Sequence, residues 1–452
     1  MRVARIEVPQ LPPPVLQVAA QLAAAGGRCW LVGGTVRDLL RGESPRDFDI
    51  ATDLVPADVL RAVPEADGRD ARLGACQLTA TVPSMSITTL RRERGYTDHR
   101  HPDQVEFVRD LAIDALRRDF TVNAIYLDLA SGELCDPCGG QRHLAEGVLA
   151  TIGPAAERLR EDPLRLLRAV RFAARCQLEP TPELRAAAIA QAELLQTLSK
   201  ERIFAELDDA FTSPGRGRAL RLLVEFGLAA VVLPEVAAMD GVTQPPEYHP
   251  EGDVLTHVCL VLDQVPAGQS ALSWSAVLHD VGKPPTWRQA EDRIRFDGHD
   301  TLSADMADAV LRRLHASNEL REAVVDVCLQ HIRFAALPGM RPRKAERWLR
   351  SPAFPLHLAF HRADCMGSHG DLTIHAFATA ALAALPPERP PLVVAADVMA
   401  LGVPPGPAIG RLLRAVQAAA DESTVSMDRQ QALVLLRDMV ERGDQGPLGA
   451  AR

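Results

Sequence analysis

The stretch that most constrains this chain joins an apolar run, a double glycine and an amphipathic segment between residues 30 and 40. Residues 30–32 are apolar and predict a buried strand, which ends at Gly33 and Gly34. Residues 35–40 predict a helix that begins close to the glycines. A strand, glycines and a helix start in this order let backbone N–H groups approach a phosphate closely, and Arg37 adds a cation for the same anion. The stretch therefore predicts a phosphate-binding turn.

Two carboxylates follow this turn. Asp47 and Asp49 flank Phe48 in a segment that predicts a strand, where side chains two residues apart share a face. Two carboxylates on one face repel each other unless a cation lies between them, so a divalent metal beside a phosphate is the natural occupant. A double glycine alone is usually a turn, and an Asp-x-Asp alone is usually a solvated strand end. Their close succession favours a metal and phosphate site.

Composition limits the class of protein. A chain of 452 residues predicts two or more domains, and its 47% hydrophobic but only 4% aromatic content favours a mainly helical protein. The net charge of −9 argues against a generally basic nucleic-acid binder, so any RNA contact must be a local basic stripe. No apolar run approaches the roughly 18 residues of a membrane span, and we do not expect the first 14 residues to be a signal peptide, because they contain no apolar core. We expect a cytoplasmic protein whose eight cysteines are reduced thiols; the single Cys-x-x-Cys at Cys135 and Cys138 is interpreted as incidental.

The run Gly-Gly-x-Val-Arg-Asp from Gly33, followed by Asp-x-Asp-Ile-Ala-Thr from Asp47, resembles the signature of the bacterial tRNA nucleotidyltransferase and poly(A) polymerase family. That family belongs to the DNA polymerase β-like nucleotidyltransferases, and the resemblance covers residues 26–235. It implies an α+β fold: a head with a mixed sheet, then a helical neck and body. It also implies template-independent addition of C and A to the 3′ end of tRNA, with CTP and ATP as substrates and Mg²⁺ on Asp47 and Asp49.

The resemblance also implies the remaining site residues of the transferase. Glu93, at the end of the strand predicted over residues 87–93, matches the family's third acid; the alternative is an exposed strand end. Residues 95–102 resemble the family's flexible loop, although His101 stands where a second arginine is usual. Residues 74–78 replace a His-Gly-Thr run that the family usually has. The residues predicted to bind the nucleotide are Gly33, Gly34, Arg37, Arg118, Asp119, Asn123, Asp162, Arg165, Arg168 and Arg171.

The run 117–124 places Asp119 and Asn123 on one polar surface, because they share a face whether the run is extended or helical. It is similar to the family's ribose-contact motif. A helix cap at Asp119 is the alternative.

A helix is predicted to begin after Glu161, with Asp162 at the cap and Pro163 at the first position. Leucines and other apolar residues line one side of it, and Arg165, Arg168, Arg171 and Arg175 line another. Asp162 and Arg165 then face the same way about a turn apart, and the matching residues of the family select cytosine or adenine. The alternatives are a cap with a salt bridge, and a solvated arginine stripe.

The second half of the chain carries patterned histidines and acids on successive predicted helices. Each one alone is more simply a core polar group. Together, across residues 250–370, they resemble the HD phosphohydrolase superfamily, whose imidazoles and carboxylates bind one or two transition metals that activate a water. The resemblance implies Ni²⁺, Mn²⁺ or Co²⁺ as the metal. The implied ligands are His257, His279, Asp280 and Asp364, with His299 and His331 lining a second metal position or the phosphate.

Four domains are predicted: a head at residues 1–140, a neck and body at 141–245, an HD domain at 246–371 and a helical tail at 372–452. A poly(A) polymerase is the close alternative function, although a long RNA would favour a basic tail that this chain lacks. A partial enzyme that adds only A or only CC is another alternative. The chain could also act mainly as a metal phosphohydrolase whose transferase half holds RNA, whereas an RNA-binding module without activity leaves two acid clusters unexplained. Neither a membrane nor an obligate protein partner is expected.

Overall fold

The computed structural model describes residues 11–79, 83–95, 102–245, 249–291, 293–385, 387, 391–423 and 427–442. The chain forms two compact units. The first comprises Met1–Leu329 with Ala363–Gly370, and the second comprises Gln330–Arg362 with Asp371–Arg452. The division into four domains is finer than this and stays a prediction. No helix among the described residues is both long and apolar enough to cross a membrane.

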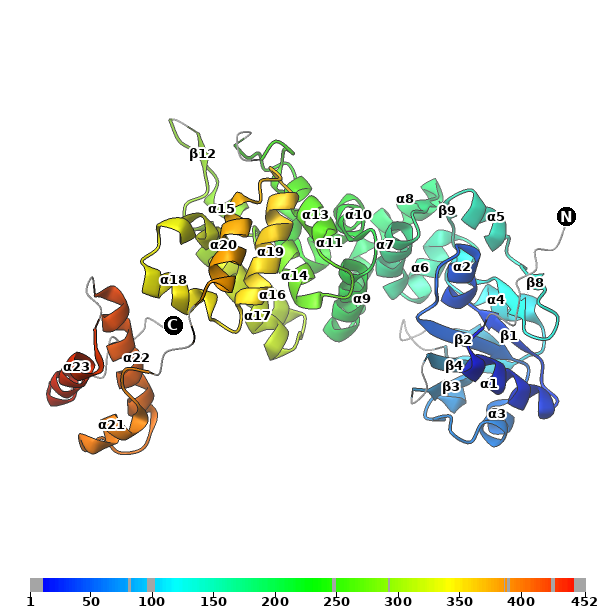
Figure 1. Ribbon diagram of the computed structural model, residues 1–452. Coiled ribbons are helices and arrows are strands. Elements are labelled where there is room, and N and C mark those ends of the chain that lie inside the picture. The colour runs from blue at the N-terminus through cyan, green and yellow to red at the C-terminus, as the bar shows by residue number, and fades with distance from the viewer. Residues whose placement is uncertain are drawn as a thin grey trace. The chain divides into compact units, whose positions relative to one another are not determined.

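The head contains a mixed six-stranded sheet, ordered β3-β4-β2-β1-β7-β8 (Figure 1). Its strands are β1 (Cys29–Val32), β2 (Asp47–Thr52), β3 (Ala75–Leu78), β4 (Ser84–Thr89), β7 (Tyr126–Asp128) and β8 (Leu134–Cys135). The pair β2 and β4 is parallel and the other pairs are antiparallel. The α+β fold class and the strands predicted around the acid pair are therefore confirmed.

Short helices accompany the sheet. They are α1 (Pro13–Ala24), α2 (Gly34–Leu40), α3 (Pro56–Ala62), η2 (Ala71–Leu73), α4 (Leu111–Leu116), η3 (Thr121–Asn123) and α5 (Gly140–Ala145). One face of the sheet forms a core with α1 and α3, and Phe48 and Ile50 of β2 are buried in it. Because side chains alternate along a strand, this burial turns Asp47 and Asp49 to the opposite face.

The strand predicted over residues 87–93 is interrupted at Leu90. Leu90 is fully buried and its N–H donates to the carbonyl of Thr52. Beyond it the chain leaves the sheet as β5 (Arg91–Arg94), which pairs with β6 (Gln104–Phe107) in a separate two-stranded sheet. The prediction of one continuous strand over residues 87–93 was therefore wrong. The interruption at Leu90 changes the direction of the Glu93 side chain. The predicted flexible loop lies largely outside the described residues, at 96–101.

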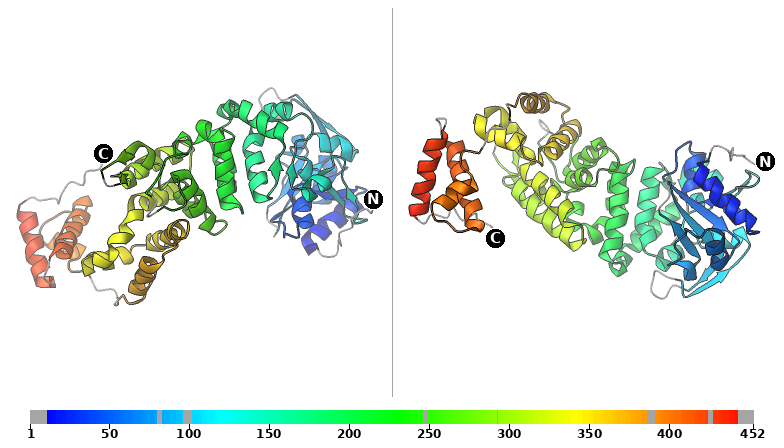
Figure 2. Two further views of the ribbon diagram at one scale, coloured as in Figure 1. Left: turned by 90° about the horizontal axis from the view of Figure 1, so that it is seen from above. Right: turned by 60° about the horizontal axis from the view of Figure 1, so that its bottom comes forward.

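Helices follow the head through the rest of the first unit (Figure 2). The neck and body contain β9 (Val148–Leu149), α6 (Ala155–Glu161), α7 (Leu164–Arg175), β10 (Glu179–Pro180), α8 (Pro182–Ala190), η4 (Ala192–Thr197), α9 (Lys200–Thr212), α10 (Arg216–Glu225), α11 (Leu228–Val232) and α12 (Pro234–Ala237). The apolar side of α7 packs against α9 and α10. Its arginine side is not a solvated stripe, because Arg165 and Arg171 are buried as well.

The patterned histidines lie on a further group of helices. These elements are α13 (Val254–Gln264), α14 (Ser270–Leu278), α15 (Lys283–Thr286), β11 (Arg288–Gln289), β12 (Ile294–Arg295), α16 (His299–Arg313), α17 (Asn318–Gln330) and α19 (Phe354–Met366). His257 lies on α13, and His279 directly follows α14, as the prediction of successive helices requires. The second unit also contains η5 (His331–Gly339), α18 (Pro342–Leu349), α20 (Thr373–Ala383), α21 (Ala395–Ala400), α22 (Pro407–Glu422) and α23 (Arg429–Glu441).

Candidate functional site

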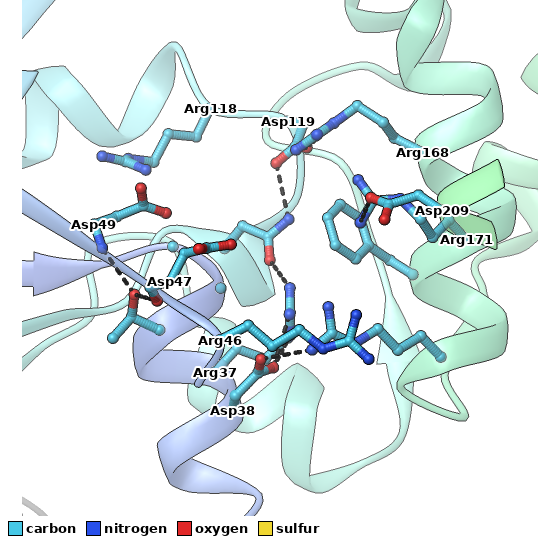
Figure 3. A pocket seen from close by; sticks show the side chains of 16 residues that line it. Arg37, Asp38, Arg46, Asp47, Asp49, Arg118, Asp119, Arg168, Arg171 and Asp209 are labelled. Carbon is cyan, nitrogen blue, oxygen red and sulfur yellow. Dashed lines mark hydrogen bonds and ion pairs between the residues drawn. The ribbon is translucent and has the colours of Figure 1, made fainter. Parts of the chain in front are cut away.

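A cavity of about 420 Å³ opens between the sheet of the head and helices α7 and α9 (Figure 3). Its wall is strongly polar. It is lined by Gly33, Gly34, Thr35, Arg37, Asp38, Arg46, Asp47, Asp49, Arg118, Asp119, Asn123, Arg168, Arg171, Phe172, Arg175 and Asp209. The cavity thus brings the glycine turn and the acid pair together with predicted nucleotide-binding residues that lie more than 100 positions later in the chain.

The acid pair is held from two sides. Ser84 and Ser86 of the parallel strand β4 each donate a hydroxyl hydrogen bond of 2.5 Å, to Asp47 and Asp49 respectively. Thr35, close to the start of α2, ties α2 to β2: its hydroxyl accepts from the N–H of Asp49 at 3.0 Å and donates to the carbonyl of Asp47 at 3.2 Å. The serine bonds occupy the Oδ1 atoms, and within the described residues no arginine or lysine forms a salt bridge with either carboxylate, so both keep oxygens for a metal. This donor set fits Mg²⁺.

The turn requires a glycine at its first position. Gly33 has a φ of 71°, and a side chain there would lie 3.2 Å from the Oδ2 atom of Asp49. The backbone therefore passes close to the acid pair, as the predicted phosphate-binding turn demands. Gly34 begins α2 directly afterwards.

Arg37 lines the cavity, but its side chain is 1% exposed and already bonded. Its Nε and one terminal nitrogen donate to Asp38, at 3.0 and 2.7 Å, and its other terminal nitrogen donates to Asn123 at 2.7 Å. Arg175 of α7 donates to the same Asp38 at 2.8 Å. Arg37 therefore joins α2, η3 and α7 into one frame.

Asp119 and Asn123 lie together, as the sequence predicted. The amide of Asn123 donates to Asp119 at 3.0 Å, and Arg168 donates to the other carboxylate oxygen through two nitrogens at 2.8 and 2.5 Å. Burial alone would raise the pKa of Asp119, but the Arg168 guanidinium and the Asn123 amide hold it well below its usual value. Asp119 is therefore a fixed anion in the cavity wall.

The ring of Phe172, on α7, contacts three arginines of the cavity wall. The guanidinium groups of Arg37, Arg168 and Arg171 lie 4.9, 5.0 and 4.5 Å from the centroid of its ring. Arg171 is also paired with Glu206 of α9 and lies 3.4 Å from Asp209. On the sheet side, Arg118 is paired with Asp114 at 3.2 Å and donates to the Tyr126 hydroxyl at 3.1 Å.

Three predicted site residues lie outside the lining of this cavity. Glu93 is paired with Arg91 at 2.6 Å and lies 3.5 Å from Arg117, because the interruption at Leu90 turns it toward these arginines.

Arg165 donates to the carbonyl of Arg158 and to Glu161, both at 2.8 Å. Asp162 accepts from the N–H of Leu164 at 3.2 Å and from Arg202 at 3.3 Å. The helix begins one residue later than predicted, with Pro163 at the cap position, and Asp162 bonds the first N–H of α7 from the preceding residue.

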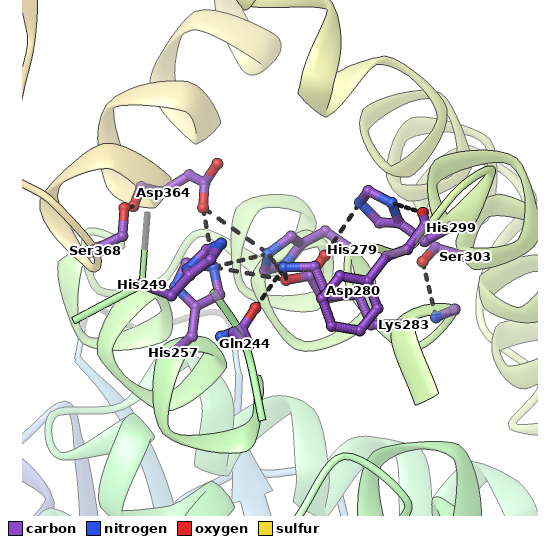
Figure 4. A network of polar contacts seen from close by, with 12 residues as sticks. Gln244, His249, His257, His279, Asp280, Lys283, His299, Ser303, Asp364 and Ser368 are labelled. Atoms are coloured by element: carbon purple, nitrogen blue, oxygen red, sulfur yellow. Dashed lines mark hydrogen bonds and ion pairs between the residues drawn. The ribbon is translucent and has the colours of Figure 1, made fainter. Parts of the chain in front are cut away.

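A second cluster forms where α13, α14 and α19 meet within the first unit (Figure 4). The Nε2 atom of His257 lies 3.3 Å from Nε2 of His279 and 3.1 Å from a carboxylate oxygen of Asp364. Asp280 lies 3.1 Å from His279 and 3.7 Å from His257. His257, His279 and Asp280 are each 1% exposed. The four predicted ligands are thus brought together.

The spacing of these atoms fits a metal. Ligand atoms about 2.1 Å from a tetrahedral metal lie roughly 3–4 Å from one another. The distance between the two imidazoles and their distances to the two carboxylates, 3.1 to 3.9 Å, fall in that range. Burial would raise the pKa of Asp280, but His279 and Lys283 hold it well below its usual value, so it is a carboxylate. Two imidazoles and two carboxylates suit a borderline transition metal.

The predicted outer residues of this cluster divide between the two units. His299 begins α16, and its Nε2 atom lies 3.6 Å from Asp280. His331 is buried at the start of η5 in the second unit. Its role at the cluster stays a prediction.

Two segments of the chain match known protein families. Residues 29–150 match the family described as "Poly A polymerase head domain", and residues 177–239 match the family described as "Probable RNA and SrmB- binding site of polymerase A". Neither match reaches residues 250–370, so the resemblance to the HD superfamily stays a prediction.

Relatives extend the match along the chain. The Multifunctional CCA protein of Xanthomonas campestris pv. campestris is 33% identical over 71% of this chain and 79% of its own length. The A-adding tRNA nucleotidyltransferase of Deinococcus radiodurans is 34% identical over 86% of this chain and 90% of its own length. The chain belongs to the tRNA nucleotidyltransferase and poly(A) polymerase family. By contrast, it matches only 55% of the length of the 39% identical CCA-adding enzyme of Geobacillus kaustophilus.

Solved structures in this family share the fold. The Bacillus stearothermophilus CCA-adding enzyme in complex with CTP superposes with a TM-score of 0.70 at 24% identity, over 96% of this chain and all of that one. The Thermotoga maritima CCA-adding enzyme complexed with tRNA superposes with a TM-score of 0.57 at 16% identity, over 97% of this chain.

The sequence interpretation missed several residues of both sites. Arg46 and Asp209 line the cavity; Arg46 could have been noticed because it directly precedes Asp47, whereas Asp209 comes from α9, with no local signal. At the second cluster, the Glu251 carboxylate lies 2.8 Å from Nδ1 of His257. Lys283 lies 2.7 Å from Asp280 and could have been noticed three residues after it.

Proposed function

We propose that this chain adds C and A nucleotides to the 3′ end of tRNA without a template, from CTP and ATP. The observation that supports this most is the cavity, which places two carboxylates with open oxygens opposite a wall of arginines. Such a site suits a metal-bound triphosphate. The names of the relatives and of the solved complexes are consistent with tRNA, CTP and ATP as substrates.

In this proposal the terminal hydroxyl of the RNA attacks the α-phosphate in line, and pyrophosphate leaves. Asp47 and Asp49 would hold Mg²⁺, which supplies charge stabilisation at the attacking and leaving oxygens when bound. The backbone at Gly33 and Gly34 approaches the phosphates closely. Asp119, held as an anion by Arg168, accepts from the ribose hydroxyls.

Base choice is assigned in this proposal to Asp162 and Arg165, as the family resemblance implies. Their present contacts lie outside the cavity lining, so reading a base requires the Arg165 side chain to leave the carbonyl of Arg158. Arg168 and Arg171, which do line the cavity, then position the nucleotide. Glu93 belongs to the same proposal as the third acid, although its carboxylate is now bound to arginines.

Addition of a single A is a second candidate function. It is favoured by the A-adding relative from Deinococcus radiodurans, which matches this chain over most of both lengths. To separate the candidates, tRNAs ending at the discriminator base, at C and at CC are incubated with CTP and ATP, separately and together, and their ends are sequenced. A CCA-adding enzyme completes all three. An A-adding enzyme extends only the tRNA ending in CC, and a poly(A) polymerase continues beyond one A.

We also propose a second activity, a metal-dependent phosphohydrolase on 2′,3′-cyclic phosphate or phosphomonoester ends. The convergence of His257, His279, Asp280 and Asp364 supports it. These residues would hold Ni²⁺, Mn²⁺ or Co²⁺, which supplies an activated water when bound. Purified protein is tested for bound metal and for hydrolysis of 2′,3′-cyclic AMP. The proposal fails if neither is found.

A further inference from the structure

We propose that Arg46, an exposed arginine of the cavity, binds the phosphates of the incoming nucleotide. This inference rests on the proposed nucleotide addition, which it deepens by naming a substrate-binding residue. Arg46 lines the cavity and is exposed, and it directly precedes the acid pair in the chain. Figure 3 shows Arg46 among the side chains that line the cavity.

Arg46 differs from the other arginines of the cavity in its ion pairing. Six arginines line it: Arg37, Arg46, Arg118, Arg168, Arg171 and Arg175. Arg37 and Arg175 share Asp38, Arg118 is paired with Asp114, Arg168 with Asp119, and Arg171 with Glu206. Within the described parts of the chain, Arg46 is the lining arginine for which no carboxylate partner is present. Its positive charge is therefore the uncompensated one.

The paired arginines are poorly suited to capture the nucleotide by themselves. A guanidinium that is buried against a carboxylate has part of its charge neutralised, and moving it would leave a buried anion unpaired. Arg37, Arg168 and Arg171 are further fixed against the ring of Phe172. An exposed, unpaired guanidinium loses only hydration and side-chain freedom when it binds a phosphate, and its fork matches two phosphate oxygens.

The ligand chemistry follows from the position of Arg46. A nucleoside triphosphate bound through metal at Asp47 and Asp49 carries more negative charge than the metal neutralises, so a further cation beside the acid pair is required. The same chemistry also exists in the RNA backbone. We commit to the triphosphate, because Arg46 directly precedes the strand β2 that carries Asp47 and Asp49.

The test compares Arg46→Ala with Arg46→Lys in the full-length protein. Arg72 gives a matched control: it is an exposed arginine of the head that does not line the cavity and has no ion pair in the described chain. The dissociation constants of ATP and AMP are measured in the presence of Mg²⁺ and without RNA. KM values are then measured separately for ATP, CTP and tRNA.

We expect Arg46→Ala to weaken ATP binding and to raise the KM of ATP and CTP alike, each by about tenfold, the size of one lost charge-assisted contact. AMP binding, the KM of tRNA and the choice between CTP and ATP should not change. Arg46→Lys should restore part of the loss, and Arg72→Ala should behave as wild type. A merely structural role would not separate ATP from AMP in this way.

A changed KM for tRNA with unchanged ATP binding would assign Arg46 to the RNA backbone and overturn the inference. Unchanged values for all ligands would overturn it as well. Wild-type protein that binds ATP with Mg²⁺ but extends no RNA would refute the proposed function. The ATP and AMP binding data would still decide the role of Arg46 in that case.

Discussion

The transferase cavity and the histidine cluster both gather acids for a metal, but they do so in opposite environments. Asp47 is exposed and Asp49 half-buried, and each is held by a serine hydroxyl beside an open cavity. His257, His279 and Asp280 are fully enclosed, with ligand atoms already at metal-binding spacing. The first site presents two ligands to a metal that can arrive with a triphosphate, whereas the second offers a nearly complete ligand set of its own. We therefore expect metal binding to depend on substrate in the head and to be independent of it in the cluster.

The largest effect expected in either region is that of Asp49→Asn. Losing one carboxylate of the pair should lower nucleotide addition roughly a thousandfold, because several kcal/mol of transition-state stabilisation depend on the metal. Metal binding and hydrolysis at the histidine cluster should be unchanged. Radiolabelled ATP incorporation into tRNA measures the first, and Asp70→Asn, at an exposed position of the head outside the cavity, is the control. Near-normal incorporation would contradict the assignment.

The reciprocal change is Asp280→Asn, which preserves the shape of the side chain. It should remove hydrolysis and lower the affinity for Ni²⁺, Mn²⁺ or Co²⁺ by about 10–100-fold or more, because one anionic ligand is lost. Nucleotide addition should remain. Asp280→Ala should do the same but also lower thermal stability, since it leaves Lys283 buried without its carboxylate.

Exposed Asp305 of α16 provides the control for this pair, as Asp305→Asn. If wild-type protein binds no transition metal and hydrolyses no phosphoester, the cluster only ties helices together. Asp280→Asn would then change stability alone, and the comparison of two metal sites would be wrong.

A smaller effect is expected from Asp119→Asn. The carboxylate should accept from ribose hydroxyls while Arg168 holds it ionised, so its loss should raise the KM of ATP about tenfold. Discrimination of ATP from dATP should fall at the same time. Steady-state kinetics with both nucleotides measure this, and an unchanged ratio would show that Asp119 serves only to anchor Arg168.

The smallest effects should come from Asp162→Ala and Arg165→Ala. If Asp162 and Arg165 read the base, both variants should lower the selectivity for CTP and ATP over UTP and GTP more than they weaken triphosphate binding. If the present contacts describe their whole role, Arg165→Ala should lower only the melting temperature, because Arg165 ties α7 to Glu161 and the carbonyl of Arg158. Misincorporation assays and thermal melts on the same preparations distinguish the two results.

The head was predictable where its signals were local. The strand, glycine turn and alternating Asp-Phe-Asp needed only a period of two and a glycine at positive φ, and the structure has them at β1, Gly33 and β2. Asp119 and Asn123 also share a surface in either conformation, so their proximity followed from spacing. The contacts of Glu93 had a non-local origin: Leu90 is buried at the end of the sheet, and the chain beyond it pairs with β6.

The partners of the arginines depended on tertiary structure. Periodicity correctly placed Arg168 and Arg171 on one side of a helix, but it could not show that this side meets Asp119 and Glu206, 49 and 35 residues away in the chain. Nor could it show that Arg165 would bond to α6 instead of facing the cavity.

The sequence by itself determined the α+β class, the acid pair on one face of a strand and the set of histidines and acids expected to share a metal. Each of these depends on backbone periodicity or on residue chemistry that neighbours along the chain do not change. Only the tertiary structure decided which charges are already neutralised. Ion pairing depends on groups brought together from distant segments, and that pairing separates the fixed arginines of the cavity from Arg46.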